Sequence, residues 1–64
     1  MAELTPKVIE AFGAHESPVA IDIFRRTLEE TYGYKTETYE REVQAAGLTV
    51  RVRVVVGFEV QEER

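Results

Sequence analysis

The sequence contains no cysteine and no tryptophan, and it has a single histidine. Without cysteine there is no disulfide, and one histidine without cysteine cannot form a closed transition-metal site within one chain. A chain of 64 residues buries only about 60% of the surface that it exposes when unfolded, so its stability alone is small. Small domains are usually stabilised by disulfides, a structural metal or self-association, and here self-association is the one that is left.

The chain also lacks a surplus of basic residues and any long hydrophobic run. It has 12 acidic and 8 basic residues and a net charge of -4, which disfavours binding to the phosphate backbone of nucleic acids. No stretch approaches the roughly 18 apolar residues of a membrane span, and residues 1–6 do not resemble a signal peptide. We therefore expect one soluble, cytoplasmic domain over residues 1–64, with no membrane partner.

The most regular pattern is "LTVRVRVVVGFEV", from Leu48 to Val60, in which every second residue is hydrophobic. This is the period of a strand with one buried face. A strand so long and aliphatic would aggregate if an edge were left bare, so we expect a neighbouring strand on each side. We expect a helix to cover the aliphatic face. The outward face would then carry Arg51, Arg53, Val55 and Gly57.

The stretch "SPVAIDIFRRTLEETYGY" predicts a helix over residues 18–32. Ser17 suits the N-cap, Pro18 the first helical position, and Gly33 the left-handed residue after the last turn. The expected buried face consists of Ile21, Phe24, Leu28 and Tyr32, while Arg25, Arg26, Glu29 and Glu30 are expected to point away.

The strand-forming stretch "YKTETYEREV" leads into "QAAGL", where Gly47 suits a tight turn, so a hairpin into the long strand is expected. A connection of two or four residues places Tyr39 and Val43 on the aliphatic face, whereas three residues would place Glu40 and Glu42 there. We take the first alternative, in which the second strand is a half-covered edge that also carries Lys35, Glu37 and Arg41 on that face. The expected pairs are Val43 with Leu48, Tyr39 with Val52, and Glu40 with Arg51.

The other neighbour of the long strand is predicted to be "KVIEAF", residues 7–12. A short helix capped by Thr5 is the competing interpretation, but it would have fewer than two turns and little intrinsic stability. A strand instead completes a three-stranded sheet, about the minimum for independent stability. The predicted fold class is therefore α+β, a β-α-β-β chain with a three-stranded antiparallel sheet, the long strand in its centre, and one helix packed across one face.

Three stretches, "KVIEAFG", "ESPVA" and "VRVRVVVGFEVQEE", resemble the dodecins, small β-α-β-β proteins that assemble as hollow dodecamers and bind flavins. The resemblance implies a homo-oligomer, a dodecamer in that family, with flavin as the cofactor. The flavin site of the family uses a tryptophan and a glutamine. This chain has no tryptophan, and aligning on "VGF" places Arg51 at the glutamine position. The candidate ligand-binding residues are Arg51, Tyr34, whose ring could stack on a flat ligand, and Thr36 on the same expected face.

Catalytic and metal motifs are missing, so we expect no enzyme. His15 beside Glu16 is expected to be a solvated loop histidine, and the carboxylates Glu37, Glu40 and Glu42 are expected to protect an edge rather than to converge for acid–base chemistry. The tyrosines Tyr32, Tyr34 and Tyr39 are expected around the end of the helix.

The favoured function is a small homo-oligomeric binding, storage or structural-assembly protein that takes a flat or anionic small molecule such as a flavin. Its expected assembly surface is the outward sheet face that contains Arg51 and Arg53. The alternative is a small nucleic-acid-binding or regulatory module that uses the same two arginines.

Overall fold

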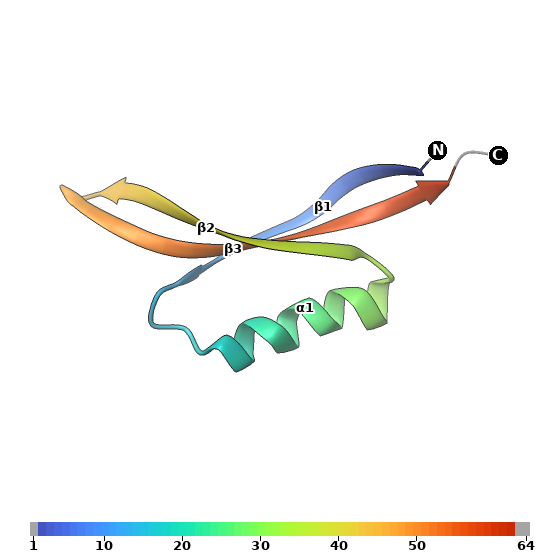
Figure 1. The fold of residues 1–64 in the computed structure, drawn as a ribbon, viewed down its shortest axis with the longest axis horizontal. Helices are drawn as coiled ribbons and strands as arrows, with labels where there is room; N and C mark the ends of the chain where they lie inside the picture. Colours follow the sequence, from blue (N-terminus) through green and yellow to red (C-terminus); the bar gives the residue numbers. More distant parts are fainter. Residues whose placement is uncertain (1, 63–64) are drawn as a thin grey trace.

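A computed structural model describes residues 2–62 of the chain, and these residues form three strands and one helix. The sheet is antiparallel with the strand order β1-β3-β2, and the helix lies along one of its faces (Figure 1). The predicted α+β fold class and the predicted strand order are confirmed. The elements are β1 (Ala2–Gly13), α1 (Pro18–Tyr32), β2 (Lys35–Ala45) and β3 (Leu48–Glu62).

The ends of α1 are set by local signals. The Ser17 hydroxyl accepts a hydrogen bond from the Val19 N–H at 3.1 Å, and Pro18 occupies the first turn, where a missing N–H costs nothing. Gly33 ends the helix with a φ of 70°, in the left-handed region. Both predicted helix ends are confirmed.

The first strand is longer than residues 7–12, because β1 begins at Ala2 and ends at Gly13. Its pairing with β3 is interrupted by a bulge between Pro6 and Val8. The bulge adds one residue and changes the alternation. Leu4 and Ile9 therefore share a face of the sheet although they are five positions apart, opposite Val60 and Val56 of β3 respectively.

The turn between β2 and β3 has two residues, Ala46 and Gly47, with φ values of 52° and 76°. Positive φ at both positions matches the tight turns that join antiparallel strands. The predicted pairs are wrong by two residues: Tyr39 lies opposite Val54 and Glu40 opposite Arg53. A shift of two positions keeps each side chain on the same face, so the predicted placement of Tyr39 on the aliphatic face is correct.

The helix packs on the opposite face of β3 from the one that the sequence pattern predicted. Val55 is 0% exposed and forms the core with Ile21 and Leu28 of α1. A Cβ atom at Gly57 would lie 3.1 Å from Cδ1 of Leu28, so the missing side chain lets the helix approach the sheet. The expected outward face is therefore the inner one. Beside Val55, the missing side chain at Gly57 leaves the room in which Leu28 of α1 packs.

Partly buried residues complete this core from both sides of the helix. Phe12 of β1 meets Phe24 of α1 edge to face, with ring centroids 5.4 Å apart. Val8 and Tyr34 also pack against the core. Tyr32, expected on the buried face of the helix, is 59% exposed, and that expectation is wrong.

Candidate functional site: the open face of the sheet

The face of the sheet that points away from α1 is covered by no helix or strand of residues 2–62 (Figure 1). We call it the open face. It carries the aliphatic row of β3 together with the side chains that lie opposite that row on β1 and β2. Its large exposed hydrophobic residues are Leu4 and Ile9 of β1, Tyr39 and Val43 of β2, and Leu48, Val50 and Val60 of β3.

The middle of the open face is filled by neighbouring side chains even without a helix above it. Val54 lies between Ala11 and Tyr39, and Val56 lies opposite Ile9. Both valines are buried. Ile9, in contrast, is 66% exposed. The open face is therefore a well-packed apolar ridge with accessible hydrophobic flanks.

Three charged residues of β2 lie on the open face: Lys35, Glu37 and Arg41, opposite Phe58, Val56 and Val52 of β3. Within residues 2–62, none of the three forms an ion pair. The open face thus combines a hydrophobic centre with charges of both signs along the β2 side.

The arginines expected to face outward lie on the helix side of the sheet and are paired. Arg51 Nη2 is 3.4 Å from a carboxylate oxygen of Glu42, and Arg53 Nε is 3.4 Å from one of Glu40. Both pairs join directly opposite residues of β2 and β3. Such exposed pairs stabilise a sheet only modestly, by roughly 0.2 to 1 kcal/mol each.

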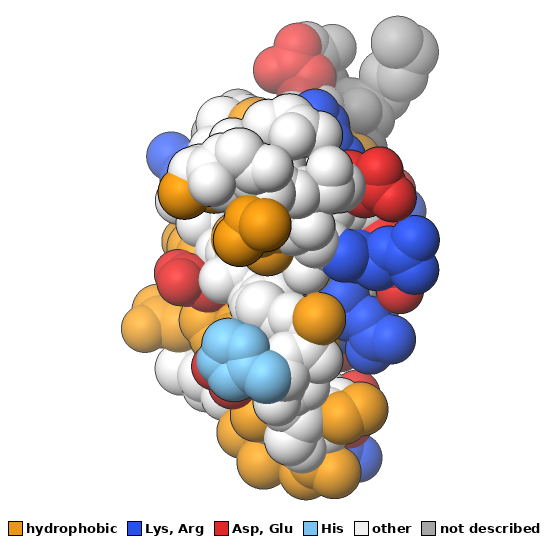
Figure 2. Space-filling view, turned by 90° about the vertical axis from the view of Figure 1, so that its left-hand side faces the viewer, with side chains coloured by type: hydrophobic (Ala, Val, Ile, Leu, Met, Phe, Trp, Pro, Cys, Tyr) orange, Lys and Arg blue, Asp and Glu red, His pale blue; other side chains and the backbone are white. Residues whose placement is uncertain are grey.

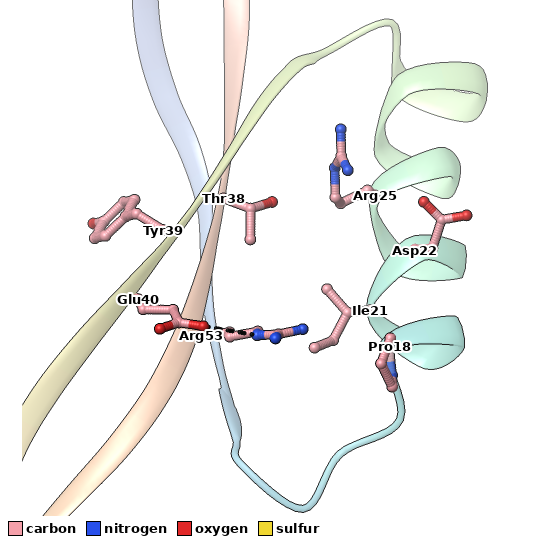
Figure 3. A pocket seen from close by; sticks show the side chains of 8 residues that line it. All are labelled: Pro18, Ile21, Asp22, Arg25, Thr38, Tyr39, Glu40 and Arg53. Atoms are coloured by element: carbon pink, nitrogen blue, oxygen red, sulfur yellow. Dashed lines mark ion pairs between the residues drawn. The ribbon is translucent and has the colours of Figure 1, made fainter.

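A groove of about 320 Å³ lies between α1 and β2 (Figure 3). Arg53 extends from β3 toward the first turn of the helix, Ile21 points from the helix toward the sheet, and Tyr39 points away from the helix to the open face. Further along, the Arg25 Nε donates to Thr36 Oγ1 at 3.5 Å, and the Thr36 hydroxyl donates to Glu29. Arg25 and Glu29 therefore contact β2 instead of pointing away as expected.

The structure brings two of the three candidate ligand residues near each other. Tyr34 stacks on Tyr32 with ring centroids 5.4 Å apart, and Thr36 follows at the start of β2. Thr36 lies opposite Gly57, six positions along β3 from Arg51, a distance of about 20 Å. Arg51 instead lines a second cavity, of about 220 Å³, beside Ala14. A single flavin-sized ring system does not contact Arg51 and Tyr34 together.

Groups that could perform acid–base or metal chemistry are dispersed. The His15 side chain is 86% exposed, and its Nε2 atom lies 3.7 Å from Oε1 of Glu16. Glu37 lies on the open face, whereas Glu40 and Glu42 pair with arginines on the other face. Across residues 2–62, no three metal-ligating side chains come together. No helix in the same residues is long and apolar enough to cross a membrane.

A second exposed hydrophobic surface lies on the outer side of α1. Seen from the hairpin end, hydrophobic side chains gather at the lower side of the molecule, where the helix lies, and Lys and Arg gather on one flank (Figure 2). Val19 and Ile23, one turn apart on α1, are both more than half exposed. This patch has fewer large hydrophobic residues than the open face.

Compared with models of known protein families, with curated proteins and with solved structures, the chain has no match. The resemblance to dodecins stays a prediction. The open face itself was missed from the sequence because the aliphatic row was assigned to the core. The signal that could have revealed it is Gly57, two positions from Val55 on the same face, where the missing side chain leaves room for Leu28 of the helix.

Proposed function

We propose that the protein is a non-enzymatic homo-oligomer, a binding or structural-assembly protein of the dodecin-like kind, in which copies bury their open faces against one another. The observation that carries this proposal is the exposed hydrophobic content of the open face. Monomeric proteins rarely expose contiguous apolar patches larger than a few hundred Å². The assembly surface proposed is the face opposite to the one expected from the sequence.

The size of the open face supports the proposal. With strands about 4.8 Å apart and a rise of about 3.3 Å per residue, the 12, 11 and 15 residues of β1, β2 and β3 give a footprint of roughly 600 Å². Two copies would cover about 1,200 Å² together, which is within the size range of specific interfaces.

The charges on the open face favour a second copy of the chain as the molecule that covers it. The open face carries Lys35 and Arg41 as well as Glu37, so two copies can compensate each other's charges across a shared contact. The core also supports it, because the buried hydrophobic residues of the described chain number only five: Ile21, Leu28, Val54, Val55 and Val56. Association supplies the burial that such a short chain lacks.

A flat or anionic small molecule such as a flavin remains part of the proposal through the resemblance to dodecins. Nucleic-acid binding through Arg51 and Arg53 has less support, because each guanidinium group lies 3.4 Å from a carboxylate oxygen. An incoming phosphate would have to displace Glu42 and Glu40.

The test is the mass in solution of the parent protein and of two matched variants, by light scattering at micromolar concentration. Ile9 on the open face and Val19 on α1 are both 66% exposed. We expect the assembly mass of the parent and of Val19→Glu to be a multiple of 7.3 kDa. The assembly mass of Ile9→Glu is expected to be lower than that of the parent, because the new carboxylate would be desolvated at the interface. A parent mass of 7.3 kDa would contradict the proposal.

A further inference from the structure

The strand β2 is an uncovered edge of the sheet. It pairs with β3 along its whole length, without a bulge, and no strand formed by residues 2–62 lies on its other side. Ten of its 11 residues are exposed. An edge strand of this length presents a row of unpaired backbone N–H and C=O groups, which is a template for another strand.

The opposite edge of the sheet is protected in a way that β2 is not. Pro6 has no backbone N–H to donate, and the bulge between Pro6 and Val8 interrupts the regular ladder of β1. The difference between the two edges therefore directs strand addition to β2.

Charge selects one register for two β2 strands paired antiparallel about a two-fold axis. Directly opposite residues share a face, so the axis must pass beside one residue, which lies opposite its own copy. An axis at Glu40, Arg41 or Glu42 sets like charges directly against each other, and an axis at Thr38 sets Lys35 against Arg41.

An axis at Tyr39 is free of these conflicts. It sets Glu37 of each copy opposite Arg41 of the other, which forms two symmetric pairs of opposite charge. Lys35 then lies opposite Val43, and the two Tyr39 rings meet at the axis. Of the registers that keep most of β2 paired, this one has no like charges directly opposite.

We propose that two copies of this chain join through their β2 strands in the register centred on Tyr39, which makes one continuous six-stranded sheet. The inference rests on the proposed homo-oligomer and names one of its contacts. The two open faces lie on the same side of the joined sheet, so the edge contact enlarges the hydrophobic surface available for further association.

Cysteine cross-linking tests the register, because the chain has no cysteine of its own. Opposite residues in an antiparallel pair have Cα atoms about 4.5 to 5.5 Å apart, within the range of about 4.4 to 6.8 Å that a disulfide accepts. We expect Tyr39→Cys to form a covalent dimer on mild oxidation. Stacked sheets lie about 10 Å apart, too far for this bond, so face-to-face contact alone does not produce the dimer.

Val43→Cys is the matched control. Val43 lies on the same strand and face as Tyr39, and both residues are 43% exposed. In the proposed register its two copies are eight positions apart, about 27 Å, so the control is expected to stay uncross-linked. Equal cross-linking of the two cysteine variants, or no cross-linking of Tyr39→Cys although the parent assembles, overturns the edge contact and leaves the proposed function standing. A parent mass of 7.3 kDa together with no cross-linking of Tyr39→Cys overturns both.

Charge reversal provides a second, independent measurement. Glu37→Arg and Arg41→Glu each place like charges opposite one another, and each is expected to raise the dimer dissociation constant about tenfold or more. The double variant is expected to restore the parent value. Within one copy these residues are four strand positions, about 13 Å, apart, so rescue requires contact between copies. A double variant as weak as the singles would contradict the register.

Discussion

Two regions of the same strand differ sharply in burial. Val54 to Gly57, in the middle of β3, are buried, and Val55 and Gly57 among them lie beneath α1, whereas Leu48 at the hairpin end is 65% exposed. The described chain extends 49 Å along its longest axis, and the 15 residues of α1 span only about 22 Å, so the hairpin projects beyond the helix (Figure 1). Hydrophobic residues occur in both regions, but α1 covers only one of them.

The two regions are stabilised by different interactions. The middle of the sheet depends on side-chain packing against Ile21 and Leu28. The hairpin end depends on backbone pairing and cross-strand contacts, including the Gln44 side-chain amide, which donates to the Thr49 hydroxyl at 2.9 Å. A two-stranded hairpin alone is marginally stable in water. The hydrophobic residues of the hairpin end are left exposed by the described chain.

The largest effect is expected from truncating the helix core. Leu28→Ala should lower the free energy of unfolding by roughly 2 to 5 kcal/mol, because it removes a buried side chain and leaves a cavity. Leu48→Ala, the same change at the hairpin end, should cost less than about 1 kcal/mol in dilute protein. Denaturant unfolding followed by circular dichroism measures both. Equal losses would remove the distinction between the two regions.

A smaller effect is expected from filling the space beneath the helix. Gly57→Ala adds a Cβ atom 3.1 Å from Leu28 and 3.3 Å from Tyr34 Cδ2, and overpacking of this kind costs roughly 1 to 3 kcal/mol. The same substitution in the Leu28→Ala background should cost clearly less, because the clashing side chain is gone. A double-mutant cycle by thermal unfolding measures this coupling. Additive losses would show that Leu28 does not sit on Gly57.

The smallest effect is expected from the ion pairs. Arg51→Gln should cost roughly 0.2 to 1 kcal/mol through the lost contact with Glu42, and added salt should reduce the difference. Arg53→Gln provides the control nearer the helix, where the side chain is less exposed and salt should screen the pair less. Unfolding at low and high salt tests the order. A greater salt effect on Arg53→Gln than on Arg51→Gln would contradict the expectation that the ion pair nearer the helix is screened less.

The sequence was sufficient to predict most of the fold. The ends of α1 followed from Ser17, Pro18 and Gly33, because caps are local signals. The strand at residues 7–12 followed from the need to pair both edges of β3. The hairpin register was missed by two residues, because Ala46 adopts a positive φ that alanine seldom takes.

The surface was harder to predict than the fold. Alternation along β3 separates its two faces, but it does not show which face the helix covers. The helix covers the face that carries Val55 and Gly57, although the other face carries the seven alternating hydrophobic residues from Leu48 to Val60. The ligand candidates Arg51 and Thr36 were grouped because they share a face, and distance along the strand then separated them.

The bulge in β1 also bears on how far a sheet built from these chains can grow. Two copies joined through β2 would leave a β1 strand at each outer edge, and each would carry Pro6 and the irregular pairing beside it. A third chain would meet a ladder there that is interrupted between Pro6 and Val8, so we expect addition along the hydrogen-bonding direction to stop after two copies. In the proposed assembly the same short irregularity would separate a closed pair from an endless cross-β filament, the product to which a strand as aliphatic as β3 is otherwise prone.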